Sequence, residues 1–270
     1  MNDPQKKRCA AAVKWLTAAA LAALMLLLAL GYGIWSGALY HASRVRLRQP
    51  EPGVRVPVLM YHAIGDDCWG EEGLFVKPAE LEKQLQYLSE NGYDTIFFED
   101  LSNLDQYDKP IILTFDDGYD DNYSILLPLL KKYNMKATVF VIAETIGAPH
   151  KLTQAQLREM AQSGLVSLQS HGWSHREMET MTWTELIQEL FRSRNTIAAA
   201  SGKVPYVLSY PNGRYSERTR TAARLFYAYA VRTYEEIYVT GNDPMQIERI
   251  AVKRGTSMEQ FIQACRQSGR

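Results

Sequence analysis

The sequence predicts an α/β domain built from parallel β/α units. Seven short apolar runs alternate with longer segments of helical periodicity, as parallel strands do when helices cover both faces of their sheet. Polar residues of the kinds used in catalysis directly follow several runs, as they do at the carboxyl edge of such a sheet. The predicted strands cover residues 56–60, 95–98, 111–115, 138–142, 165–168, 207–210 and 228–231.

The segments between these runs predict six helices. Pro78 and Glu80 are typical of a first helical turn, and Thr182 with Glu185 has the spacing of a capping box. From about Val54 onward the chain is long enough for one large domain with its own core. The predicted helices cover residues 78–90, 122–133, 153–162, 182–200, 216–226 and 257–266.

Two of the predicted strands deliver acids and imidazoles. Asp116 and Asp117 end the run at 111–115, and His171 and His175 follow the run at 165–168. Gly172 lies between the histidines and argues against a helix there, so we expect the pair in a loop. One Asp and two His can hold a divalent metal ion, which leaves the other Asp as a base. This is the equipment of metal-assisted hydrolysis.

Three motifs resemble a known family. They are, in order, Thr-Phe-Asp-Asp-Gly-Tyr at 114–119, His-x-x-x-His at 171–175 and Tyr-Pro-x-Gly at 210–213. This series resembles the polysaccharide deacetylases of carbohydrate esterase family 4, the NodB homology domain. The resemblance extends over about residues 54–261. Pro-Val-Leu-Met-Tyr-His at 57–62 is similar to the branch of poly-N-acetylglucosamine deacetylases. The resemblance implies a distorted (β/α)7 barrel that hydrolyses the acetamide group of N-acetylhexosamines in a glycan.

The resemblance also implies roles for individual residues. Asp117, His171 and His175 match the metal ligands, and Asp116 matches the general base, with a capping or supporting role as its alternative. Mixed nitrogen and oxygen ligands favour zinc, with cobalt and nickel as alternatives. A backbone N–H at Tyr210 is the expected oxyanion donor.

The chain departs from the family pattern at three points. Many members protonate the leaving amine with a C-terminal histidine, but none follows His175. Our candidate general acid is therefore His62, with a structural histidine as the alternative. Many members orient the base with an arginine in the third motif, and residues 207–211 contain none. Gly172 stands where Ser or Thr is common.

Candidates for binding the sugar come from three positions. Trp173, Pro211 and Trp69 lie in or near the motif loops, and aromatic faces stack on pyranose rings. Core packing is the alternative for each tryptophan.

The N-terminus predicts a membrane anchor. Residues 15–40 carry no Asp, Glu, Lys or Arg, and about 20 apolar residues span a bilayer. The positive-inside rule places the tail at 1–14 in the cytoplasm. The anchor is then followed by a linker over 41–53 and an extracytoplasmic deacetylase domain over 54–270. A cleaved signal peptide is the alternative.

Charge and cysteines narrow the possible partners. Residues 1–48 hold seven Lys/Arg and one Asp, net +6, which leaves −6 for residues 49–270. This argues against nucleic acid as a partner. Cys68 and Cys265 could pair.

The predicted function is a metal-dependent N-deacetylase of a cell-surface or cell-wall polysaccharide. A catalytically weakened glycan-binding relative and an O-acetyl esterase remain as alternatives.

Overall fold

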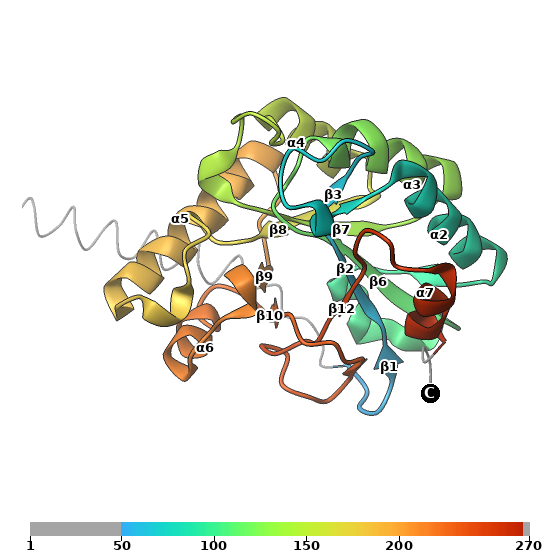
Figure 1. Cartoon of the computed structure of the whole chain (residues 1–270). Coiled ribbons are helices and arrows are strands. Elements are labelled where there is room, and N and C mark those ends of the chain that lie inside the picture. The colour runs from blue at the N-terminus through green and yellow to red at the C-terminus, as the bar shows by residue number, and fades with distance from the viewer. Residues whose placement is uncertain (1–49, 267–270) are drawn as a thin grey trace, which may run out of the picture. The chain divides into compact units, whose positions relative to one another are not determined.

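The centre of the fold is an all-parallel sheet (Figure 1). The computed structural model describes residues 50–266. Strands follow one another across the sheet in the order β10-β9-β8-β7-β6-β2-β12, and β5 pairs with the start of β6. Their bounds are β2 Val58–Tyr61, β5 Asp94–Thr95, β6 Pro110–Phe115, β7 Ala137–Val141, β8 Val166–Ser170, β9 Val207–Ser209, β10 Tyr229–Val231 and β12 Ile250–Ala251.

The two edges of this sheet approach each other through one segment. Val231 of β10 forms an isolated parallel bridge with Ile247, and Ile250 of β12 pairs with Leu59 of β2. Residues 247–251 therefore connect the first strand of the series to the last. The result is a parallel, partly closed α/β barrel of the type expected from the sequence.

Most predicted strands are confirmed, with two changes. The run at 56–60 is divided at Pro57, which has no N–H for a ladder, into β1 Arg55–Val56 and β2. β1 pairs antiparallel with β11 Tyr238–Val239. The run at 95–98 shrinks to β5, because the chain turns into the 3₁₀ segment η2 Phe98–Gln106. The sequence did not predict β11, β12 or the small sheet of β3 Ala63–Ile64 and β4 Phe75–Val76.

All six predicted helices are present, and Figure 1 shows them around the sheet. Thr182 begins α5 through the expected capping box with Glu185. The segment predicted as one helix over 122–133 starts with the π turn η3 Asn122–Leu126. The helices are α2 Pro78–Glu90, α3 Leu127–Tyr133, α4 Gln154–Gln162, α5 Trp183–Ser201, α6 Glu217–Ala223 and α7 Met258–Cys265.

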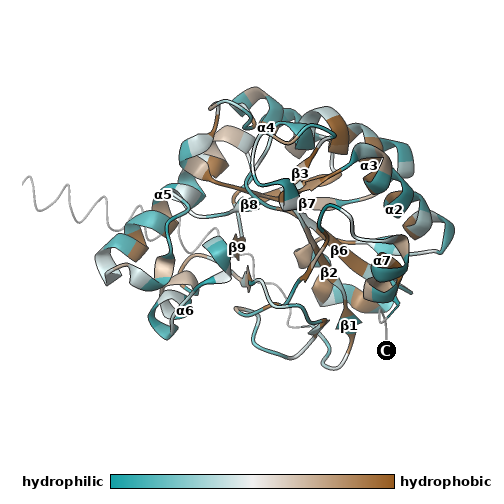
Figure 2. Ribbon diagram, in the orientation of Figure 1, coloured by the Kyte–Doolittle hydropathy of each residue, from teal (hydrophilic) through white to brown (hydrophobic). Residues whose placement is uncertain are grey.

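Residues of the strands supply three core clusters, the third of which joins Leu208 of β9 and Ala230 of β10 to α5 and α6. Leu59 and Leu113 belong to the larger cluster, which also contains residues of α2, α3, α4 and α7. Their neighbours Val58 and Ile112 face the barrel interior with Phe140. Figure 2 shows apolar strands beneath helices whose outer faces are polar. Because both faces of the strands are covered, their carboxyl ends are held rigidly.

Three expectations concern the termini and the cysteines. The predicted tail at 1–14 and anchor at 15–40 lie outside the described residues, as does most of the linker. No helix within residues 50–266 has the length and apolar character needed to cross a membrane. Cys68 is exposed and Cys265 buried, and both are free thiols, so the pairing left open by the sequence is absent.

Candidate metal centre and active site

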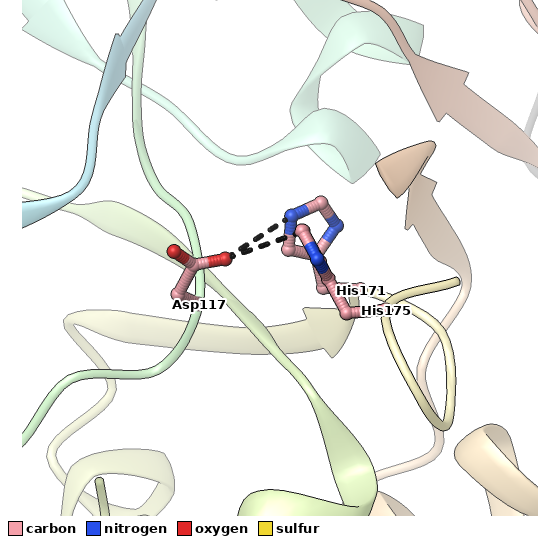
Figure 3. Close-up of side chains that lie close together, drawn as sticks. All are labelled: Asp117, His171 and His175. Carbon is pink, nitrogen blue, oxygen red and sulfur yellow. Dashed lines mark ion pairs between the residues drawn. The ribbon is translucent and has the colours of Figure 1, made fainter. Parts of the chain in front are cut away.

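Three predicted ligands meet at the carboxyl edge of the sheet. One donor atom from each of Asp117, His171 and His175 lies within 4.8 Å of the other two. Figure 3 shows the carboxylate facing both rings. Asp117 Oδ1 is 3.4 Å from His171 Nε2 and 3.7 Å from His175 Nε2. Two donors about 2.1 Å from one ion at a tetrahedral angle stand about 3.4 Å apart, so the cluster fits a single divalent ion.

The surroundings of the two histidines orient them toward Asp117. His171 Nδ1–H donates to the Ser209 carbonyl oxygen at 2.9 Å, which turns Nε2 toward Asp117. Burial lowers the pKa of His171, but Asp116 and Asp117 outweigh it and raise that pKa, so a metal ion would displace the Nε2 proton. Burial, and then the neighbouring His171, lowers the pKa of His175 to about 4. A neutral imidazole is the form that binds metals. Burial raises the pKa of Asp117, but His171 outweighs it and holds that pKa well below its ordinary value.

Two of the predicted ligands occupy unusual backbone conformations. Asp117 has φ of 74° and His175 has φ of 58°, both in the left-handed region. A non-glycine residue there costs on the order of 1–2 kcal/mol. Hydrogen bonds around the loops offset this cost: the Lys151 ammonium, for example, donates to the Asp117 carbonyl oxygen at 3.1 Å.

Asp116 is held by an arginine that the sequence analysis missed. Arg249 Nη1 donates to Asp116 Oδ1 at 2.7 Å, and its Nη2 donates to Oδ2 at 2.8 Å. Ser209 Oγ donates to Oδ2 at 3.3 Å and accepts from Nη2 at 3.0 Å. Burial raises the pKa of Asp116, but Arg249 and His171 outweigh it, so the pKa lies below its ordinary value.

Arg249 corrects one inference from the sequence. The third motif indeed lacks an arginine, but Arg249, directly before β12, takes this place instead. It is fully buried inside the barrel, where Thr114 Oγ1 and the Arg232 carbonyl oxygen accept its remaining donors at 3.1 and 3.3 Å. The available signal was Arg249 at the head of the short apolar run at 250–252.

His62 lies beside the aspartates. It directly follows β2, and its carbonyl oxygen accepts from Asn122 Nδ2 at 3.3 Å. Burial lowers the pKa of His62, while the charges of Asp116 and Asp117 oppose that effect. It is not part of the three-ligand cluster, so its imidazole is available for another role.

The structure contradicts the expected donor at Tyr210. Its N–H donates to the Val231 carbonyl oxygen at 3.1 Å, because β9 and β10 continue their ladder by one residue beyond Ser209. The Tyr210 amide is thus already occupied, and an oxyanion must be stabilised by another group. The side chain is also buried, and its hydroxyl donates to the Met245 carbonyl oxygen at 3.1 Å.

The three candidates for sugar binding differ in exposure. Trp69 is 46% exposed and contacts Tyr119, two residues after Asp117, edge to face at 5.0 Å. Trp173 packs against the larger core, with the guanidinium of Arg192 3.9 Å above its ring. Pro211 is buried and begins the 3₁₀ turn η6 Pro211–Gly213. Trp69 is therefore the most accessible of the three.

A parallel, partly closed α/β barrel with this cluster at the carboxyl edge of its sheet defines an α/β protein with a candidate metal centre. The sequence pattern described as "Polysaccharide deacetylase" matches residues 103–230. YxkH of Bacillus subtilis (strain 168), a candidate polysaccharide deacetylase, is 36% identical over 217 residues, which are 78% of this chain and 76% of YxkH.

Two further comparisons agree. The structure of the Streptococcus pyogenes deacetylase PplD in complex with acetate has a TM-score of 0.74 and 32% identity, and covers 79% of this chain and 99% of PplD. The poly-β-1,6-N-acetyl-D-glucosamine N-deacetylase of Escherichia coli (strain K12) is 27% identical over 146 residues, 47% of this chain and 22% of that protein. The chain belongs to the polysaccharide deacetylase family, whose members are hydrolases of amide bonds in polysaccharides.

Proposed function

We propose that this protein is a divalent-metal-dependent N-deacetylase that releases acetate from N-acetylhexosamine residues of a cell-surface or cell-wall polysaccharide. The observation that carries the proposal is the Asp117-His171-His175 cluster beside an arginine-held Asp116. Zinc is the expected ion, and cobalt or nickel could replace it. A bound ion would polarise the amide carbonyl and acidify a water molecule.

Asp116 is the proposed general base. Arg249 occupies one direction on each carboxylate oxygen, and Oδ2 lies 3.7 Å from His171 Nε2. A carboxylate oxygen has two lone pairs, and Ser209 Oγ takes the second one on Oδ2. Oδ1 accepts from Arg249 alone among the described hydrogen bonds, so it keeps one direction for the proton of a water. The low pKa of Asp116 makes it a weak base, which matches an acidified water better than a free one.

His62 is the proposed general acid. Attack of water on the acetamide carbon forms a C–O bond, and breaking the C–N bond releases acetate and the sugar amine. Asp116 takes one proton from the water, and the departing nitrogen needs one proton. His62 is buried next to both aspartates and is not a ligand. It is thus the described histidine that can move a proton there without disturbing the cluster.

Trp69 is the proposed contact for a sugar ring. It lies between β3 and β4 and is the exposed member of an aromatic group that adjoins the aspartate loop through Tyr119. Its ring stacks on His150 at 4.2 Å and meets Phe75 edge to face at 5.0 Å, so its orientation is fixed. Fixed aromatic rings bind apolar faces of ligands at low entropic cost.

A catalytically weakened relative was the main alternative, because the third motif lacks an arginine and no histidine follows His175. Arg249, directly before β12, holds the Asp116 carboxylate, which removes the first argument, and His62 is our proposed answer to the second. The proposal of a membrane-anchored protein with an extracytoplasmic domain rests on the sequence of residues 1–48 alone.

The test is release of amines from N-acetylglucosamine oligomers by the full-length chain in detergent. Metal-stripped protein should be inactive, and added Zn²⁺ or Co²⁺ should restore activity. Asp116→Asn should lower kcat by on the order of 100-fold or more with metal still bound, whereas Asp120→Asn, the same change outside the cluster, should not. Activity on O-acetylated oligomers alone would instead identify an esterase. Full activity of Asp116→Asn would refute the assigned base.

A further inference from the structure

The loop between the two candidate ligand histidines contains more left-handed backbone than its sequence favours. Gly172 and His175 both have positive φ, 78° and 58°. Only the first is a glycine, so the second residue is strained and needs support from outside the loop. A side chain at position 172 would crowd its neighbours, because a Cβ there would lie 3.0 Å from Met178 Cε and 3.1 Å from Glu189 Oε1.

One carboxylate gathers the N–H groups of this loop. Glu189 projects from the middle of α5, and its Oε1 accepts from the amides of Trp173 at 2.8 Å and Ser174 at 2.7 Å. Ser174 Oγ donates to the same carboxylate, 3.1 Å from each oxygen. Glu189 is only 7% exposed. A buried carboxylate is costly unless it is fully hydrogen-bonded, and here all of its bonds that the structure describes go to residues 173 and 174.

The carbonyl groups of the loop also have hydrogen-bond partners. Gly172 O accepts from Ser193 Oγ at 2.9 Å and from the Ala143 amide at 3.1 Å, and Trp173 O accepts from the Glu144 amide at 3.0 Å. Ser193 lies one helical turn after Glu189, on the same face of α5. α5 therefore holds the loop through both its donors and its acceptors.

We propose that Glu189 is a positioning residue for the metal centre: by binding the amides of Trp173 and Ser174, it fixes the separation of His171 and His175. This inference rests on the proposed function. Side chains that orient metal ligands typically change metal affinity 10- to 100-fold when they are removed. The carboxylate acts through the loop, because its described hydrogen bonds all go to Trp173 and Ser174 and none to an imidazole.

The test uses Co²⁺ as the probe and the full-length chain. Titration is followed by the visible absorption of bound Co²⁺, whose shape reports the ligand geometry. Glu189→Ala should weaken Co²⁺ binding by on the order of 10- to 100-fold and change the absorption band. Glu189→Gln keeps an oxygen that accepts from both amides, so it should restore the wild-type band and an affinity within about threefold.

The matched control is Ser201→Ala, near the end of the same helix. Ser201 Oγ bonds the carbonyl oxygens of Ile197 and Lys203, so the variant weakens α5 without reaching the loop. It should keep the wild-type affinity and band. Should Glu189→Ala fail to fold, Glu189→Asp takes its place, because it keeps the charge but draws the carboxylate back by one methylene. Like Glu189→Ala, it should weaken Co²⁺ binding and change the absorption band.

Three outcomes decide the proposal. A weakened and altered Co²⁺ site in Glu189→Ala, with rescue by Gln, supports it. Unchanged Co²⁺ affinity and band in Glu189→Ala would overturn it and leave Glu189 a purely structural residue. A wild-type chain that binds no Co²⁺ overturns the metal site and this inference together. A chain that binds Co²⁺ but releases no acetate contradicts only the proposed reaction.

Discussion

The ion pair between Asp116 and Arg249 gives the most informative prediction. Both side chains are almost completely buried and share two short charge-assisted hydrogen bonds. Arg249→Met keeps the length of the side chain but removes its charge and all its donors. It leaves the Asp116 carboxylate with Ser209 Oγ as its remaining hydrogen-bond donor.

The expected magnitude follows from this burial. Removing one partner of a buried pair costs about 3–5 kcal/mol, because an uncompensated charge remains. A domain of this size loses about 2–4 °C of Tm per kcal/mol, so the Tm should fall by about 6–20 °C. Removing both charges, in Arg249→Met with Asp116→Asn, should cost far less than the sum of the two single changes. The coupling free energy should be about 3 kcal/mol or more.

The assay is urea unfolding of the four proteins at pH 7 in the presence of a chelator. The pH dependence adds a second check. In the wild type the pKa of Asp116 is lowered, so its contribution is present above the unfolded pKa and lost as the pH falls. In Arg249→Met the largest influence that opposes burial is gone, so the pKa of Asp116 rises relative to the wild type. The difference in the free energy of unfolding between the wild type and Arg249→Met should therefore shrink as the pH falls from 7 to 5.

The control is the same measurement on the exposed pair Lys132 and Glu82. Water screens these charges, so their coupling free energy should be small. Additive effects of Arg249→Met and Asp116→Asn, within about 0.5 kcal/mol, would refute the reasoning. They would mean that the arginine does not hold the carboxylate in solution.

Three further predictions concern single positions. His171→Ala should lose both Co²⁺ binding and turnover, as measured by equilibrium dialysis and amine release; retained binding would exclude it as a ligand. His62→Gln should lower kcat by on the order of 100-fold with Co²⁺ affinity unchanged, and a loss of affinity would contradict its separate role. Burial raises the pKa of Asp121 to about 7, so its ionisation opposes folding between about pH 4 and 7. Asp121→Asn should therefore raise the free energy of unfolding at pH 8, by at most about 4 kcal/mol, and leave it unchanged near pH 4. An equal change at both values would contradict that pKa.

The sequence alone was enough to predict that Asp117, His171 and His175 lie close together, because these residues follow strands. Asp117 ends a fully buried apolar run, and His171 follows another. In parallel β/α units such ends meet on one face, so local patterns were enough to bring together residues more than fifty positions apart. The helices were predictable for a similar reason, since periodicity and capping boxes are local signals.

Tertiary structure decided the contacts that depend on how the barrel closes. Arg249 reaches Asp116 only because β12 pairs with β2, and a two-residue strand leaves almost no periodic signal. The Tyr210 amide is occupied because β10 continues its ladder past Ser209. Glu189 binds the histidine loop because α5 packs beneath it. Each contact pairs groups from distant segments, and the energy of such pairs depends on burial and distance, which a linear pattern does not contain.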